Sequence, residues 1–232
     1  MKGALISVEG NWGHFKKPET NNNPLTHDFI TKTALIGMVG AVLGIERPEM
    51  KELFPQLSEN LCYGVLIHSV VKKESWSFKL RYASNLFEKR PVQMEFLKNP
   101  RYTIAIGLRD ERSASYFNQF IAALESSEAR FTPVLGLHNC PANLGFIASG
   151  ELKQSDGDFQ TKSFVTEQHK IIKAFLTEKF RVGVDRIPTY QNDDFWNLPD
   201  KYVRVFYPSE DREISASGAH YEFTDGSKWV LI

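Results

Sequence analysis

The sequence predicts an α+β domain, and three features favour this class. Short aliphatic runs that read as strands alternate with helix-like segments in the first half of the chain. The second half consists mainly of further strand-like runs separated by turn formers. The composition, 42% hydrophobic and 24% charged over 232 residues, is typical of a globular protein that buries a core.

The first predicted elements are a strand, a long loop and an apolar helix. Residues 3–12, "GALISVEGNW", form a short aliphatic run that suits a strand. Residues 14–29 are polar and rich in Asn, Pro and Thr, which favours a loop. The helix follows in residues 30–46, and either Thr31 or Thr33 is available as its N-cap.

The next segments complete a repeating strand and helix pattern. Residues 46–57 predict a turn and short helix, and residues 60–71 predict a central strand. The charged, aromatic-rich stretch 72–100 has no clean period, so we expect a hairpin or arm outside the core. A strand (101–108), a helix (113–130) and the strand-like "TPVLGL" (132–137) follow. This order fits a ferredoxin-like βαββαβ unit.

The remaining runs predict a β-rich C-terminal region. The expected strands lie in residues 145–152, 179–188, 201–209 and 218–232, with "TDGS" (224–227) as a hairpin turn. We therefore expect two parts, a first domain over residues 1–148 that carries the arm at about 72–100, and a β-rich subdomain over 149–232. The boundary is not marked by a Pro/Gly/Ser linker.

Charge and cysteine content narrow the possible functions. The net charge of zero argues against an indiscriminate nucleic-acid binder. Residues 1–112 nevertheless carry a net charge of +4 and residues 113–232 a net charge of −4, so a polyanion site is expected in the first half. Cys62 and Cys140 lack further ligands at metal spacing and are interpreted as buried free thiols in a cytoplasmic protein.

The helix at residues 30–46 contains three glycines, Gly37, Gly40 and Gly44, although each costs roughly 1 kcal/mol relative to alanine. The apolar run is too short for the ~20 residues of a membrane span, so no membrane contact is expected. Gly40 and Gly44 are interpreted as sites of close packing on a sheet. Gly37 lies nearer the helix start, where free amides, two threonines and Lys32 favour phosphate binding.

Two motifs together resemble a known family. "TKTALIGMVGAVLG" (31–44) and "TPVLGLHNCPANL" (132–144), after a first strand and the loop "HFKKPET" (14–20), resemble the Cas-five family of CRISPR–Cas systems. That family belongs to the RAMP superfamily of RRM-like RNA binders, and the similarity is closest to type I-B members. It covers residues 2 to about 152, and the β-rich remainder more weakly. The resemblance implies an RRM-like palm, with residues 72–100 as a thumb hairpin.

The resemblance also implies a function. A family member is a non-catalytic subunit of Cascade that grips the 5′ handle of the CRISPR RNA, without a cofactor or metal. Its thumb is expected to reach the backbone subunit, and the protein also contacts the large subunit. Target DNA would be met only indirectly, through the complex. The role is antiviral defence in the cytoplasm.

The expected contacts combine cations, aromatic rings and backbone amides, which single-stranded RNA requires. In the arm, the same mixture also suits a protein contact. The predicted RNA-binding residues are Lys16, Lys17, His27, Thr31, Lys32, Thr33, Gly37, Arg81, His138 and Asn139, and the predicted thumb residues are Trp76, Phe78, Tyr82, Lys89 and Arg90. The opposing interpretation is that Phe15 and Cys140 are core residues and that both loops are architectural.

The main alternative is a metal-independent endoribonuclease that processes precursor CRISPR RNA. Such cleavage needs a base, an acid and a cation near one phosphate. His14 and His27 lie in the basic loop and are the candidates, whereas His68 is expected to be a buried core histidine. A metal-dependent nuclease would need clustered carboxylates, and the acidic runs 192–194 and 209–213 read as surface turns without a neighbouring histidine.

Overall fold

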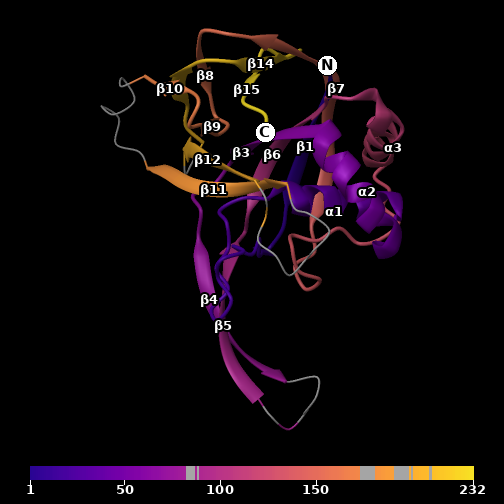
Figure 1. The fold of residues 1–232 in the computed structure, drawn as a ribbon, viewed down its shortest axis with the longest axis vertical. Coiled ribbons are helices and arrows are strands. Elements are labelled where there is room, and N and C mark those ends of the chain that lie inside the picture. The colour runs from indigo at the N-terminus through magenta and orange to yellow at the C-terminus, as the bar shows by residue number, and fades with distance from the viewer. Residues whose placement is uncertain (82–86, 88, 173–180, 191–198, 200, 209–210) are drawn as a thin grey trace.

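The structure is a computed structural model that describes residues 1–81, 87, 89–172, 181–190, 199, 201–208 and 211–232. It is a mixed α/β fold with few helices and many strands (Figure 1). The helices are α1 (Lys32–Leu43), α2 (Arg47–Asn60) and α3 (Ala114–Glu125), with a 3₁₀ turn η1 (Glu111–Ser113). The strands are β1 (Lys2–Glu9), β2 (Trp12–Gly13), β3 (Leu61–Ile67), β4 (Lys73–Arg81), β5 (Lys89–Lys98), β6 (Arg101–Leu108), β7 (Asn143–Ser155), β8 (Asp158–Thr161), β9 (Val165–Thr166), β10 (Lys170–Ile171), β11 (Val182–Tyr190), β12 (Lys201–Pro208), β13 (Ile214–Ser217), β14 (His220–Phe223) and β15 (Lys228–Trp229).

A six-stranded antiparallel sheet forms the centre of the molecule. Its strand order is β15-β14-β7-β1-β6-β3. Strands β1 and β6 pair from Gly3 opposite Gly107 to Glu9 opposite Arg101, and β7 pairs with the other edge of β1. Strands β1 and β6 therefore lie side by side although helices and a hairpin separate them in the chain, and β3 lies at the edge of the sheet.

The strand expected at residues 132–137 is wrong. This segment folds back on itself, because the amide of Leu135 donates to Cys140 O at 2.7 Å and that of Ala142 donates to Pro133 O at 2.9 Å. Its only ladder contact is an isolated bridge from Val134 to Pro141. The strand that pairs with β1 is β7 instead, and it continues through the expected boundary between residues 148 and 149.

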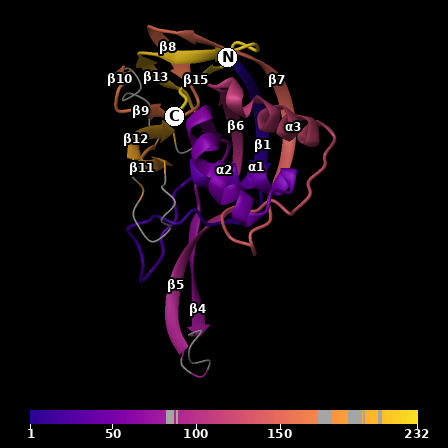
Figure 2. The same ribbon diagram turned by 45° about the vertical axis from the view of Figure 1, so that its right-hand side comes forward.

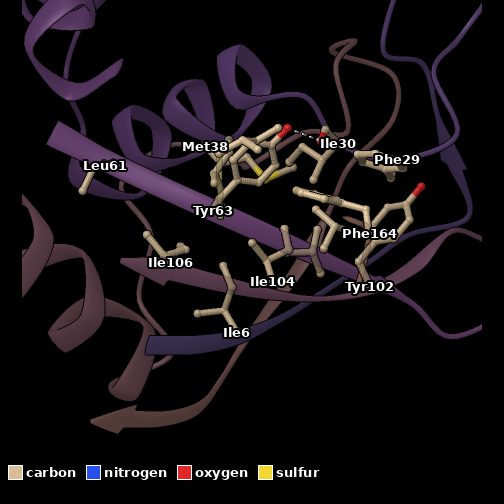
Figure 3. Packing of buried hydrophobic residues seen from close by; sticks show 14 of the residues in the cluster. Ile6, Phe29, Ile30, Met38, Leu61, Tyr63, Tyr102, Ile104, Ile106 and Phe164 are labelled. Carbon is tan, nitrogen blue, oxygen red and sulfur yellow. Dashed lines mark hydrogen bonds between the residues drawn. The ribbon is translucent and has the colours of Figure 1, made fainter. Parts of the chain in front are cut away.

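Helices cover one face of the sheet. Side chains alternate along each strand, so Ile6, Ile104 and Tyr63 point to the same side and pack beneath α1. Figure 3 shows this packing, with Met38 of α1 above Tyr63 and the tyrosine hydroxyl donating to the carbonyl of Ile30 at 3.3 Å. The core thus fixes the amino end of α1 against β3.

Strands β7, β14 and β15 and the chain end supply apolar side chains to the opposite face. Leu5, Cys62 and Ala105 point to this side and contact Trp229 and Leu231. The "TDGS" turn joins β14 to β15 as predicted, with Gly226 in the left-handed region at φ +84°. The chain end therefore returns to the central sheet, where the amide of residue 232 pairs with the Tyr63 carbonyl.

The three glycines of α1 have three different environments. Thr31 is the N-cap and accepts a hydrogen bond from the Ala34 amide at 3.4 Å. Gly44 is the C-cap, with φ +75°, rather than a packing residue on the sheet. A side chain at Gly40 would overlap the end of Met50, so this glycine admits α2 and not a strand. Gly37 is exposed, and an added Cβ would meet nothing within 4 Å.

Strands β4 and β5 form a long hairpin that projects from the body in both ribbon views (Figures 1 and 2). Its base belongs to the core, because Phe96 and Leu97 are buried and Trp76 packs against Phe96 and Trp12. The charged stretch 72–100 is therefore an arm only beyond this base. In the described part of the chain, no helix has the length and apolar character needed to cross a membrane.

Candidate functional site

Three segments that are distant in the sequence meet along one side of α1. They border a hollow of about 400 Å³. Thr33 and Gly37 form its floor on α1, Lys16 stands in the loop on one border, and Gly136 lies in the loop on another. The remaining lining residues are His14, Phe15, Pro18, Thr31, Ala34, Met38, Ala41, Val134, Leu137 and Pro188. We call this hollow the α1 groove.

Gly136 allows the two loops that border the groove to touch. Its φ is +90°, and a Cβ at this position would overlap the backbone carbonyl of His14. The amide of His14 in turn donates to the Leu135 carbonyl at 2.9 Å. Only glycine fits this approach, so the 132–141 loop is fixed directly against the segment that carries Lys16.

Lys17 and His27 belong to a buried ion-pair network rather than to the groove. Asp185 of β11 lies 2.9 Å from the Lys17 ammonium and 2.9 Å from His27 Nδ1. Burial alone would raise the pKa of Asp185, but the bonds from His27 and Lys17 lower it below its ordinary value. His27 is 1% exposed, so its ring supports the loop from within and does not reach the surface.

A second set of ion pairs fixes the same loop to the hairpin base. Lys73 of β4 lies 2.7 Å from Asp28 and 3.2 Å from Glu95 of β5. Burial opposes the charge of Lys73, but both carboxylates hold its pKa above the usual value. Tyr207 of β12 also donates to Asp28 at 2.6 Å. The loop over residues 14–29 is therefore clamped by the hairpin and by the C-terminal strands.

Lys32 lies on the other side of α1, away from its neighbours Thr31 and Thr33. It is 4% exposed and borders a second hollow of about 670 Å³ with Arg109 and Lys201. Desolvation, followed by repulsion from Arg109, lowers the pKa of Lys32 to about 8. The predicted "TKT" cluster is thus divided between two hollows.

The remaining predicted contacts do not border the α1 groove. His138 and Asn139 follow Gly136 by two and three residues, and both are exposed in the 132–141 loop. Arg90 extends from the hairpin and donates to Asn22 at 2.6 Å, and Trp76 and Phe78 pack at the hairpin base. Tyr82 and the side chains of Arg81 and Lys89 lie outside the described residues.

The histidines proposed for RNA cleavage are buried. His14 is 2% exposed, its Nδ1 lies 2.7 Å from the Glu95 carbonyl, and burial lowers its pKa. His68 is exposed and bonds to Thr103 at 2.7 Å, so its expected burial in the core is wrong. The residues that the structure describes hold no group of three metal-ligating side chains. The acidic run 192–194 lies outside them, as do residues 209 and 210.

Several site residues gave no signal in the sequence. Asp185 and Pro188 come from β11 and border the N-terminal loop only because the C-terminal strands fold back over it. Lys201 opens β12, and Arg109 directly follows β6. Local pattern carries no information on contacts between such distant segments.

The α1 groove is thus bordered by a helix terminus, a lysine-bearing loop and a glycine-dependent turn. The family model described as "CRISPR-associated protein (Cas_Cas5)" matches residues 5–209. The chain therefore belongs to the Cas5 family of CRISPR-associated proteins, as the resemblance implied. Comparison with curated proteins gave no match.

Solved structures show the same fold at low sequence identity. A CRISPR protein from Archaeoglobus fulgidus aligns with 100% of this chain and 99% of its own, at 15% identity and a TM-score of 0.62. A chain of a CRISPR RNA-guided surveillance complex aligns over 97% and 92%, at 12% identity and 0.54. A chain of a Type III-B Cmr-beta complex bound to target RNA aligns over 92% and 86%, at 9% identity and 0.51.

Proposed function

We propose that this protein is a non-catalytic subunit of a type I CRISPR surveillance complex, closest to type I-B, and that the α1 groove grips the 5′ handle of the CRISPR RNA. The observation that carries the proposal is the convergence of the loop at Lys16, the α1 face at Gly37 and the loop at Gly136 on one hollow. Membership of the Cas5 family supplies the class of ligand.

The chemistry of the groove suits single-stranded RNA held by shape. Gly37 leaves open space above the helix, so a sugar–phosphate strand or a base can approach the α1 backbone closely. Thr33 and the backbone of the 132–141 loop offer polar groups, and Lys16 is an exposed cation on the border. With one lysine among the described lining residues, the grip depends more on fit than on net charge.

The rest of the fold fits a subunit with several partners. In this proposal β1, β3, β6 and β7 with α1 and α3 form a ferredoxin-like, RRM-type palm, since their neighbours in the sheet follow the order of that fold. The β4–β5 hairpin is the thumb that reaches a backbone subunit. The large subunit is contacted elsewhere on the surface, and target DNA is met only through the complex.

In this proposal the protein binds RNA but does not cleave it as an endoribonuclease. A base for attack by a 2′-hydroxyl must come within hydrogen-bond reach of the RNA. His14 and His27 are both buried beneath the loop, in contact with the Glu95 carbonyl and with Asp185. The groove therefore offers RNA its loops and helix face, while the two histidines hold that loop in place.

The test measures binding of a labelled RNA that carries the 5′ handle of the protein's own CRISPR repeat. Gly37→Gln places a side chain in open space, so the fold is retained and the helix gains roughly 0.5–1 kcal/mol. We expect at least about tenfold weaker RNA binding, a loss of about 1.4 kcal/mol. The control, Asn118→Gln on the exposed side of α3, leaves binding unchanged.

The same samples decide between binding and cleavage. Precursor repeat RNA incubated with the wild-type protein in EDTA should stay intact while the handle RNA is bound. Cleavage in EDTA would contradict the non-catalytic role. Unchanged affinity in Gly37→Gln would remove the α1 groove from the proposal.

A further inference from the structure

The second hollow beside α1, which we call the Lys32 hollow, contains an unusual cation. Lys32 is 4% exposed, yet it has no hydrogen bond or ion pair from its ammonium group within the described part of the chain. The two other partly buried lysines near α1 both have carboxylate partners, Asp185 for Lys17, and Asp28 with Glu95 for Lys73. A buried charge without a partner is destabilising by several kcal/mol in general, so it marks a place where a partner is expected from outside.

Two further cations lie around Lys32. Arg109 and Lys201 border the same hollow from the end of β6 and the start of β12. Glu59 of α2 is the one acidic side chain among the described lining residues, and it is exposed. The pKa of Lys32, lowered to about 8 by desolvation and by Arg109, still leaves the ammonium group charged at pH 7.

The lining also provides neutral hydrogen-bond donors at several positions. Gln154 of β7, Gln168 and Thr166 face the hollow together with Tyr221. The oxygens of a phosphate group are arranged tetrahedrally and accept from donors outside any single plane, whereas the two oxygens of a carboxylate accept mainly within the carboxylate plane. Donors that arrive from α1, β6, β7 and β12 therefore fit a phosphate better than a single carboxylate.

We propose that the Lys32 hollow is a phosphate-binding site, separate from the α1 groove, in which Lys32 is the buried cation and Arg109 and Lys201 close the site. The phosphate is either a phosphodiester of the bound RNA or a free phosphate group. The two hollows border the same helix end, one at Lys32 and the other at Thr31 and Thr33. The phosphate site itself does not depend on the groove binding RNA.

The first experiment uses inorganic phosphate as the probe. Thermal unfolding of the wild-type protein is measured in rising phosphate against chloride at matched ionic strength. We expect phosphate to raise the midpoint temperature of unfolding of the wild-type protein. For Lys32→Met, at least about tenfold more phosphate should be needed to produce the same rise. Lys51→Met, at an exposed position of α2 that lines neither hollow, is the matched control and keeps the full response.

The second experiment identifies the source of the phosphate. Handle RNAs that carry one uncharged methylphosphonate linkage at a time are bound to the wild-type protein and to Lys32→Met. One such linkage should weaken RNA binding by the wild-type protein about tenfold but leave RNA binding by Lys32→Met unchanged. That result assigns the site to the RNA phosphate at this linkage. A response to inorganic phosphate without such a linkage assigns it to a free phosphate.

The proposal is overturned if the wild-type protein responds to neither probe, a result that would favour an acidic side chain of a partner protein. It is also overturned if Lys32→Met responds as the wild type does. Arg109→Gln, at an exposed residue, repeats both experiments if Lys32→Met fails to fold. Gly37→Gln blocks only the α1 groove, so this variant should keep the wild-type response to inorganic phosphate even if it no longer binds RNA. The two proposals can therefore fail separately.

Discussion

The two sides of α1 differ in how they are prepared for an anion. On the groove side, Gly37 leaves an uncharged floor in open space and Lys16 stands exposed at the border. On the other side, Lys32 is buried without a partner and two further cations border the same hollow. In the two proposals, the first surface selects its ligand by shape and the second selects by charge. One helix start therefore carries two different kinds of surface, although Lys32 and Gly37 lie within the six residues 32–37.

The largest expected effect concerns the loop contact that shapes the groove. Gly136→Ala combines a left-handed φ of +90° with an overlap between Cβ and the His14 carbonyl. We expect a loss of about 3 kcal/mol in the free energy of unfolding, measured in urea. The control is Gly226→Ala, where φ is +84° but nothing lies within 4 Å of the added Cβ, so it should lose only about 1 kcal/mol. Equal losses would mean that the loop contact does not shape the groove.

The next effect tests the unpaired charge on the other side. Lys32 has a pKa of about 8 in the folded protein and about 10.5 unfolded, so folding releases its proton between these values. Wild-type stability should therefore rise from pH 8 to about pH 10.5 relative to Lys32→Met, by about 3 kcal/mol in total. Below pH 8 the full penalty of the charge is present. Urea denaturation of both proteins at pH 7, 8, 9 and 10 measures the difference.

Lys32→Met leaves the other charged and ionisable groups that face this position in place. These are Arg109, Lys201, Cys62, Glu59 and His169. A stability difference that does not change with pH would show that Lys32 is solvated or paired in the folded protein, and the contrast between the two hollows would disappear.

The smallest effect compares two adjacent lysines. Lys16 borders the groove, whereas Lys17 is held by Asp185 at 2.9 Å. Lys16→Ala should reduce the slope of log affinity against log salt by about 0.7 for the handle RNA, the contribution of one phosphate contact to a single strand. Lys17→Ala should leave that slope unchanged and lower the unfolding midpoint instead. The reverse pattern would place the RNA on the network side of the loop.

The sequence was sufficient to predict the elements that depend on local pattern. The aliphatic run of β1, the alternation in β6, the apolar spacing of α3 and a threonine N-cap of α1, at Thr31 or Thr33, are all read from neighbouring residues. The strand expected at residues 132–137 failed because its alternation is satisfied inside a loop, through Leu135 and Cys140. Short apolar runs do not distinguish a loop that packs on itself from a strand that joins a sheet.

The candidate site was predicted only in part, for a physical reason. The motifs identified Thr33, Gly37 and the Gly136 loop, and the fold brings them together. The sequence could not show that Lys32 points to the other side of the helix, because helix phase depends on which face packs on the sheet. Nor could it show that Asp185 would bind Lys17 and His27 across 158 or more residues.

The central claim is that RNA lies along the groove side of α1. It is tested most directly with handle RNA that contains photoreactive 4-thiouridine, bound to the unmodified protein, irradiated, and mapped by mass spectrometry. The account predicts crosslinks in the segments 14–18, 31–41 and 134–137, and few elsewhere on the body. Crosslinks confined to the exposed side of α3, at residues such as Ser115 and Asn118, would contradict it.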